Sequence, residues 1–332
     1  MAARRSDPVI LLSRSDVAAL LPFDACIAAV EQALALEARG RMAPASSLGM
    51  AVAGGGFHVK AATLPGARPY FAAKCNGNFP ANPQMRGLPT IQGVIVLADA
   101  TDGRPLAIMD SAEITLLRTG AATALAALHL ARADAQVATI CGCGVQGRIQ
   151  LRAVLAARAI ARVYAIDTDR TIAERFAAEA RAAFGIDVVV DEDIGTAARA
   201  SDICVTCTTS KTWLLGREHV RPGTFIAAVG ADNPEKQEIE PELLAQSALV
   251  TDSVTQCAEI GELHHAIKAQ TVTRDHVRAT LGEVVAGLRA GRTTQDETVI
   301  FDSCGIAIED VAAAASVYEA ALRDGRGLRV VL

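Results

Sequence analysis

The stretch Val137-Ala-Thr-Ile-Cys-Gly-Cys-Gly-Val-Gln-Gly147 decides the fold of this chain. It begins as a short, largely apolar run of the kind that forms a buried strand. Gly142, Gly144 and Gly147 have the spacing Gly-x-Gly-x-x-Gly, and a helical pattern follows from Ile149 to Leu155. In such a unit the first glycine permits a tight turn and the second lets a pyrophosphate approach the backbone, while the third lets the helix pack on the strand. The stretch therefore predicts a dinucleotide-binding loop at a helix N-terminus.

A second apolar run, Val163-Tyr-Ala-Ile166, strengthens this prediction because it ends on Asp167. Asp167 lies 20 residues beyond Gly147, where an acid typically holds the ribose 2′-hydroxyl of NAD. Its charge would repel a 2′-phosphate, so the sequence favours NAD. Arg170 nearby keeps NADP as an alternative, since an arginine can accept that phosphate.

Composition limits the functional classes. The chain has 332 residues, of which 51% are hydrophobic and 21% charged, and this balance predicts a globular protein of two domains. The net charge of −5 gives no basic surface for nucleic acid. No stretch is long and apolar enough for a membrane span, and the N-terminal run is too short for a secretory core. We therefore expect a cytoplasmic protein with no membrane partner.

Eight cysteines raise the alternatives of disulfides or a metal site. Cys141, Cys204 and Cys207 lie in apolar runs, where free thiols behave as small hydrophobic residues. Cys204-Val-Thr-Cys207 has the C-x-x-C spacing, but neither a second pair nor a histidine cluster completes a zinc site. The sequence therefore predicts no metal.

The pattern of the chain changes near residue 134. Before it, helical patterns from Asp16 to Arg39 break at Pro22 and precede short strands, which predicts an α+β region with an antiparallel sheet. Ser111 is expected to cap a helix that ends near Arg132. After it, strands and helices alternate, as in a doubly wound α/β domain. The predicted strands are 57–61, 70–75, 90–97, 105–109, 137–141, 162–166, 186–190, 202–207, 224–229 and 248–251.

The C-terminal part returns to the first region. A strand over Thr298–Phe301 precedes an amphipathic helix over Ala307–Leu322, which would pack back on the first domain. We therefore predict an α/β fold with two domains. A Rossmann doubly wound domain covers residues 131–306, and an α+β domain covers residues 1–130 with 307–332.

Arg118 is the second informative residue. From Leu116 to Leu130 the only side chains that could carry charge are Arg118 and His129. A guanidinium on so apolar a helix needs a partner, because burying it unpaired is costly. It either forms an internal salt bridge with a carboxylate such as Glu113, or clamps a substrate carboxylate with two hydrogen bonds.

Lys74 ends an apolar strand and precedes a turn, so it is either a solvated strand end or part of a site. Lys60 lies on the neighbouring predicted strand and could approach the same place. Two lysines converging with Arg118 would make an anion pocket suited to a small acid.

Asp232 follows the strand Phe225–Val229, at the edge of a doubly wound sheet where ligands bind. It is either a helix cap or an acid/base group near the reacting carbon. His264 and His265 are interpreted as structural, because adjacent helical residues point in different directions.

Several segments in one order resemble the ornithine cyclodeaminase/mu-crystallin family, over roughly residues 10–322. Together they are far more specific than the glycine motif alone. The segments are Lys74-Cys-Asn-Gly-Asn-Phe-Pro80, Gly87-Leu-Pro-Thr90, Ile114-Thr-Leu-Leu-Arg-Thr119, Gly142-Cys-Gly-Val-Gln146, Gly230-Ala-Asp-Asn-Pro-Glu-Lys236 and Phe301-Asp-Ser-Cys-Gly305.

The resemblance implies a homodimer whose antiparallel sheet domain carries the substrate and dimer contacts beside the Rossmann domain. By position, Lys74 and Arg118 would bind the substrate carboxylate, and Asp232 would be the acid/base group. The residues implied around the dinucleotide, nicotinamide and substrate are Thr90, Thr208, Val229, Lys236, Cys304 and Gly305.

Two departures from the family pattern bear on the reaction. Ser46 stands where family members often carry an arginine, and Lys60 is a candidate replacement for that carboxylate partner. Ornithine-cyclising members carry a glutamate near Ala61-Ala62, to meet the distal amine of the substrate. A small apolar residue cannot do that.

The sequence therefore predicts an NAD(P)-dependent oxidoreductase that acts on the Cα–N bond of a small amino or imino acid. The alternatives are an ornithine-type cyclodeaminase that uses NAD⁺ catalytically, and a non-catalytic ligand-binding protein of the mu-crystallin type. The predicted site comprises Asp232 and Lys74 as catalytic residues, Lys60, Lys74, Arg118 and Gly305 for substrate, and Thr90, Gly142, Gly144, Val145, Gln146, Asp167, Thr208, Val229, Lys236 and Cys304 for cofactor.

Overall fold

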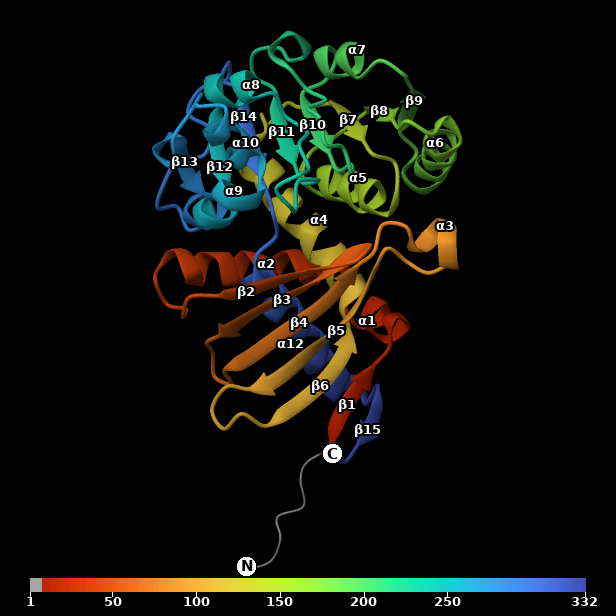
Figure 1. Cartoon of the computed structure of the whole chain (residues 1–332), viewed down its shortest axis with the longest axis vertical. Coiled ribbons are helices and arrows are strands. Elements are labelled where there is room, and N and C mark those ends of the chain that lie inside the picture. The colour runs from red at the N-terminus through yellow and green to blue at the C-terminus, as the bar shows by residue number, and fades with distance from the viewer. Residues whose placement is uncertain (1–7) are drawn as a thin grey trace, which may run out of the picture. The chain divides into compact units, whose positions relative to one another are not determined.

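The computed structural model describes residues 8–332, which divide into two compact units (Figure 1). Unit 1 comprises the chain up to Arg118 together with Ile306–Leu332, and unit 2 comprises Thr119–Gly305. The division falls inside helix α4 (Ser111–Leu130), whereas the sequence predicts a boundary at the end of that helix. The predicted domain limits, 1–130 with 307–332 and 131–306, stay a prediction.

Unit 1 is built on sheet A, in the strand order β15-β1-β6-β5-β4-β3-β2. The pair β1–β6 is parallel and every other neighbouring pair is antiparallel. The predicted antiparallel strands are confirmed, and the sequence missed the short edge strands and the exposed β2. The strands are β1 (Val9–Leu12), β2 (Ser46–Val52), β3 (Gly55–Leu64), β4 (Tyr70–Asn78), β5 (Ile91–Asp99), β6 (Pro105–Asp110) and β15 (Leu328–Val330).

Strand β4 shows how sheet A separates its two faces. Tyr70, Ala72 and Lys74 are buried, while the alternate residues Phe71 and Cys75 are exposed. Successive side chains of a strand point to opposite faces, so Lys74 belongs to the inner face. Helix α12 (Ala307–Asp324) covers this face and packs against α2 (Phe23–Ala38), as Figure 1 shows behind the strands.

The helices of unit 1 confirm one predicted break and correct two expectations. Pro22 separates α1 (Arg14–Leu20) from α2, as predicted. Ser111 does not cap α4: Asp110 Oδ1 accepts the N–H of Glu113 at 2.9 Å instead. The hydroxyl of Ser111 donates to Asn76 Oδ1 at 2.5 Å.

Helix α12 is the second correction, because its first three turns have no solvated face. Almost every residue there is buried, including Glu309 and Asp310. A helix that is buried nearly all round belongs to the core. Its two acids must therefore have partners inside unit 1. The remaining helix of this unit is α3 (Asn82–Arg86).

Unit 2 is a doubly wound domain. Its sheet B is parallel throughout, in the order β13-β12-β14-β11-β10-β7-β8-β9, and the chain reverses its direction of travel between β7 and β10. Ligands bind at the carboxyl ends of strands at such a switch point. The Rossmann prediction is confirmed. The strands are β7 (Val137–Cys141), β8 (Arg162–Ile166), β9 (Asp187–Val190), β10 (Ile203–Thr206), β11 (Phe225–Ala228), β12 (Ala248–Thr251), β13 (Val277–Thr280) and β14 (Val299–Asp302).

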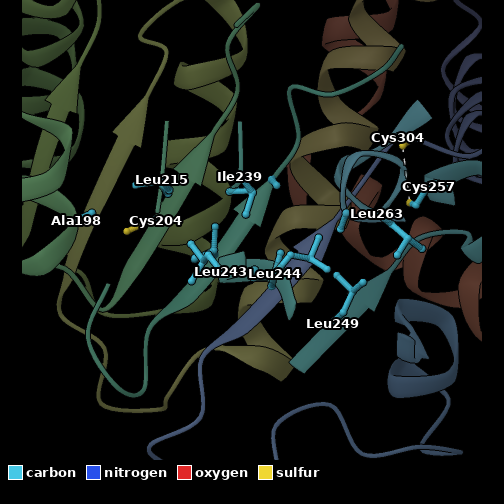
Figure 2. Close-up of a cluster of buried hydrophobic side chains, with 14 residues drawn as sticks. Ala198, Cys204, Leu215, Ile239, Leu243, Leu244, Leu249, Cys257, Leu263 and Cys304 are labelled. Carbon is cyan, nitrogen blue, oxygen red and sulfur yellow. Dashed lines mark hydrogen bonds between the residues drawn. The ribbon is translucent and has the colours of Figure 1, made fainter. Parts of the chain in front are cut away.

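Helices cover both faces of sheet B. They are α5 (Val145–Ala157), α6 (Arg170–Phe184), α7 (Ile194–Arg199), α8 (Pro241–Gln246), α9 (Val254–Ile260), α10 (Glu262–Lys268) and α11 (Leu281–Val285). Figure 2 shows one buried cluster of this unit, with Cys204, Leu244, Leu249 and Leu263 among its side chains. Cys204 is therefore a core residue, as predicted. Among residues 8–332, Cys204 and Cys207 belong to no group of metal-ligating side chains.

No single helix in the described part of the chain is long and apolar enough to cross a membrane. Helices α1 and α2 reach that length only as a pair bent by 82°.

Candidate active site

The glycine loop joins β7 to α5 as the sequence predicts. Gly142 has φ +98°, a backbone conformation that side-chain-bearing residues rarely adopt, and a Cβ there would lie 2.9 Å from the carbonyl oxygen of Cys207. A Cβ at Gly147 would overlap the carbonyl oxygen of Gly142, so only glycine lets α5 approach the loop this closely. The space beside Gly144 is open within 4 Å, and Val145 and Gln146 begin the helix. The loop thus fits the pyrophosphate of a dinucleotide.

Asp167 lies directly after β8 and braces the same loop. Its Oδ2 accepts the N–H of Cys143 at 2.8 Å, and its Oδ1 accepts the N–H of Asp169 at 3.0 Å. The exposed Arg170 pairs with Glu174 at 2.8 Å and with Glu192 at 2.7 Å. Its guanidinium is therefore engaged by carboxylates.

A buried acid that the sequence reading missed, Glu238, holds the ends of β10 and β11. Its Oε1 accepts both the N–H and the hydroxyl of Thr208 at 2.6 Å, and its Oε2 accepts the N–H of Gly230 at 3.0 Å. Burial raises the pKa of Glu238, and the bonds from Thr208 oppose that rise. Glu262 in turn accepts the N–H groups of Glu238 and Ile239. The signal that the sequence offered was an acidic residue directly before Ile239, an apolar residue that forms an isolated β-bridge.

The loop after β11 brings two predicted residues together. It starts at Val229, whose N–H bonds to the carbonyl of Thr206. Asp232 Oδ1 lies 2.7 Å from Lys236 Nζ, and the Asp232 side chain is 42% exposed. No helix starts within this loop, so Asp232 is not a helix cap. His265 Nε2 bonds to the carbonyl of Lys236 at 2.7 Å and fixes the loop against α10.

Cys304 and Gly305 follow β14, at the same edge of sheet B. Gly305 has φ +73°, and Asp252 Oδ2 accepts its N–H at 2.5 Å. The amide of Gln256 donates to the carbonyl of Gly305 at 2.8 Å. Both peptide groups that flank this turn are thus fixed to the segment that begins α9.

In unit 1, Lys74 and Arg118 meet two acids of α12. Lys74 is 4% exposed, and its Nζ lies 2.7 Å from Asp310. Arg118 lies 2.9 Å from Glu309 and 3.3 Å from Asp310. The internal salt bridge considered for Arg118 therefore exists with these two acids. The expected partner Glu113 is wrong, because Glu113 pairs with Arg14 at 3.0 Å.

Lys60 joins this group across the sheet. It stands directly opposite Lys74 in the β3–β4 register, so both side chains are on the inner face of sheet A. Burial lowers the pKa of Lys74 to about 8, with Arg118 and Lys60 adding to that shift and Asp310 opposing it. Burial acts to raise the pKa of Asp310, but Lys74, Arg118 and Lys60 hold it below its ordinary value.

These five side chains form what we call the cation cluster: Lys60, Lys74, Arg118, Glu309 and Asp310. Three cations face two carboxylates, which leaves one positive charge in excess. The net positive charge of these five side chains suits the cluster to one additional anion. A carboxylate has the charge and the geometry that a guanidinium and an ammonium accept.

Three further positions complete the predicted set. Ser46 pairs with Ala61 at the edge of sheet A, and Ala62 is buried on the inner face opposite Ala72. Thr90 lies half-buried just before β5, and its carbonyl accepts the N–H of Phe79.

Comparison with known proteins gives consistent results. An alanine dehydrogenase of Archaeoglobus fulgidus is 36% identical over 323 residues, which cover 97% of this chain and 98% of that protein. An archaeal alanine dehydrogenase dimer with bound NAD superposes with a TM-score of 0.92 at 37% identity, covering 97% of this chain and 98% of that one. Thermococcus litoralis Delta(1)-pyrroline-2-carboxylate reductase, solved with NADH and L-proline, gives 0.90 at 32% identity, covering 97% and 100%.

The family comparison agrees with the resemblance read from the sequence. The model of the ornithine cyclodeaminase/mu-crystallin family matches residues 8–325. With relatives above 30% identity over nearly the whole chain, the assignment does not depend on any one motif. The chain belongs to the ornithine cyclodeaminase/mu-crystallin family.

Proposed function

We propose that this protein is an NAD-dependent oxidoreductase that acts on the Cα–N bond of a small amino or imino acid. The observation that carries this proposal is the cation cluster of unit 1, whose one excess positive charge suits a single carboxylate. Unit 2 of the same chain contains the dinucleotide loop. A chain that holds a small carboxylic acid and NAD has the two reactants of such a reaction.

The residues of unit 1 bind and orient the substrate. The guanidinium of Arg118 and the ammonium of Lys74 receive the substrate carboxylate, and Lys60 adds a third positive charge from the adjacent strand. Lys60 thereby takes the place of the arginine that family members often carry at the position of Ser46. Because Glu309 and Asp310 already fix these cations, little side-chain entropy is lost on binding.

The residues of unit 2 hold the cofactor and exchange the proton. When bound, NADH supplies hydride to the substrate carbon. The glycine loop, Asp167 and Thr208 bind and orient the dinucleotide. Asp232 exchanges a proton with the substrate nitrogen through its half-exposed carboxylate, and Lys236 holds Oδ1 in place at 2.7 Å. Positioning of these groups supplies most of the acceleration.

NAD is the preferred cofactor. Asp167 places a carboxylate after β8, where a 2′-phosphate would be repelled. Arg170, the residue that kept NADP as an alternative, is engaged by Glu174 and Glu192. KM values for NADH and NADPH measure this preference directly, and an equal KM for both would contradict it.

The cyclodeaminase alternative is less well supported by the side chains on the inner face of sheet A. Ala62 is buried on the inner face and offers no acid for a distal amine. The two reactions are separated by the NADH absorbance, because a cyclodeaminase shows no net change at steady state and releases ammonia from ornithine. A non-catalytic binding protein would show neither. Asp232→Asn tests the role of Asp232, since unchanged turnover would remove Asp232 from the mechanism.

We also propose a homodimer formed through the outer face of sheet A. Large apolar side chains are exposed there on β2, β3, β4 and β5: Leu48, Met50, Phe57, Phe71 and Val94. Exposed apolar surface of this kind marks association sites. The archaeal relative with bound NAD is described as a dimer. Light scattering of the wild type and of Phe71→Lys tests the face, and a Phe71→Lys dimer as stable as the wild type would contradict it.

The substrate class is tested with a panel. Pyruvate and other 2-oxo acids with ammonia or methylamine, and cyclic imino acids, are each assayed with NADH and NADPH. We expect NADH-dependent reduction of substrates with one carboxylate. Turnover of ornithine without net NADH change, and no reduction of any imino acid, would replace the proposal with the cyclodeaminase.

A further inference from the structure

Two cysteines from different elements of unit 2 meet at the edge of sheet B. Cys257 belongs to α9 and Cys304 follows β14, and Figure 2 shows their sulfurs pointing toward one another. The two Sγ atoms are 3.7 Å apart. Cys257 is fully buried and Cys304 is 5% exposed. A covalent S–S bond is about 2.05 Å long, so the sulfurs must approach by roughly 1.7 Å to bond.

The surroundings of this pair supply a base. The thiol of Cys257 donates to Asp252 Oδ1 at 3.3 Å, and Asp252 also accepts the hydroxyl of Ser303 and the N–H of Gly305. The thiolate is the reactive form of cysteine, and a carboxylate in contact with the thiol can take its proton. Burial raises the pKa of Cys257 well above the ordinary value, so the thiol stays protonated until it reacts.

A metal ion is the competing occupant, because Asp302 and the two sulfurs lie within 4.8 Å of one another. The carboxylate is already engaged by the backbone, because Asp302 Oδ2 accepts the N–H of Leu263 at 2.9 Å. A disulfide needs no added atom. The geometry therefore favours oxidation of the pair over metal binding.

We propose that Cys257 and Cys304 form a reversible disulfide when the protein is exposed to a peroxide. Cys304 attacks a peroxide oxygen as the thiolate and the O–O bond breaks. The proton lost by the thiol joins the leaving hydroxide, so that a sulfenic acid and one water result. Cys257 gives its proton to Asp252 and attacks the sulfenic sulfur, so that the S–S bond forms and a second water leaves. Two thiols lose two electrons and hydrogen peroxide gains them. A dithiol reverses the reaction.

The disulfide would act on turnover through the segment that carries Cys304. Gly305 is fixed by Asp252 and Gln256, so a sulfur drawn toward α9 moves against an anchored turn. This consequence rests on the proposed function and on the family resemblance, which implies that Cys304 and Gly305 lie around the nicotinamide and substrate. A displacement of about 1 Å at a reacting centre can lower a rate by up to about a hundredfold. We expect oxidation to lower kcat by about tenfold.

The test uses the reduced full-length protein treated with hydrogen peroxide. We expect the intact mass to fall by two hydrogens and peptide mapping to recover a Cys257–Cys304 cross-link. Dithiothreitol should restore both mass and turnover. Cys257→Ala should keep the turnover of the reduced enzyme and lose the cross-link, whereas Cys75→Ala, which removes the exposed thiol of β4, should keep the response.

The outcomes separate the two proposals. Absence of the cross-link after peroxide treatment, or a cross-link between other cysteines, overturns the disulfide. A Cys257–Cys304 cross-link without loss of turnover overturns its regulatory effect. A reduced protein that turns over no imino acid overturns the proposed function, yet the mass measurement still decides the disulfide.

Discussion

The two units hold their buried acids in opposite ways. In unit 1, Glu309 and Asp310 face the side-chain cations Arg118 and Lys74. In unit 2, Glu238 and Glu262 are held by backbone N–H groups. Side-chain ion pairs fix cations that can still receive another anion, whereas acids bound to N–H groups fix the path of the chain. The first arrangement suits substrate binding, and the second suits a rigid cofactor site.

Breaking the cation cluster should have the largest effect. In Arg118→Met, we expect kcat/KM for the amino or imino acid to fall by about a thousandfold, because truncating one partner of a buried charge pair costs about 2–5 kcal/mol. Steady-state kinetics measures this. Arg14→Met is the matched control, since the Arg14–Glu113 pair is exposed on the arginine side. Adding Glu309→Gln to Arg118→Met should recover melting temperature but not turnover. A loss below about tenfold would contradict the role of Arg118.

The pKa of Lys74 sets the next largest effect. Its pKa of about 8 means that the ammonium predominates below pH 8 and the neutral amine above it. Because only the ammonium attracts a carboxylate, kcat/KM should fall about tenfold per pH unit above 8. The pH profile of Lys74→Arg is the control. The fall in its kcat/KM should move to higher pH, since arginine stays charged. An identical limb in both proteins would assign the titration to another group.

Lys60 should matter less, because it is only half-buried. In Lys60→Met, we expect KM for the carboxylate substrate to rise about tenfold, as a partly screened charge is worth less than a buried one. Lys211→Met, which removes an exposed lysine paired with Glu235, is the control. Unchanged apparent affinity in Lys60→Met would show that Lys60 does not replace the missing arginine.

The smallest effect should come from the backbone-held acid. In Glu238→Gln, one amide N–H would face a donor, either Thr208 or Gly230, so the loop at the sheet edge should shift slightly. We expect KM for NADH to rise about threefold while KM for the carboxylate substrate stays the same. Glu179→Gln, an exposed acid bonded to Arg148, is the control. Equal changes in both KM values would contradict the separation of a cofactor site in unit 2 from a substrate site in unit 1.

Local patterns made much of the fold predictable. The run from Val137 to Gly147 determines a strand, a turn with positive φ and a helix start, because each step depends on residues within the stretch itself. Strands such as β1 and β15 were missed because they are short and pair only with strands far away in the sequence. Asp110 rather than Ser111 caps α4, since helix ends are uncertain by a residue in any pattern.

The site was predictable where a residue contradicts its surroundings. Arg118 stood out as a charge on an apolar helix. The same reasoning applies to Glu309 and Asp310, which stand among small apolar residues, but the sequence analysis did not single them out. Their pairing with Lys74 and Arg118 connects positions far apart in the sequence, and no spacing encodes it.

Helix α12 and strand β15 follow unit 2 in the sequence, so they are synthesised after it. During translation, unit 2 emerges from the ribosome ahead of α12, so the Rossmann unit can fold while unit 1 is still incomplete. Until residue 310 emerges, Lys74 and Arg118 have no acids from α12 to pair with and sheet A lacks its covering helix. The order of synthesis thus gives the nascent chain its dinucleotide fold first and its anion pocket last.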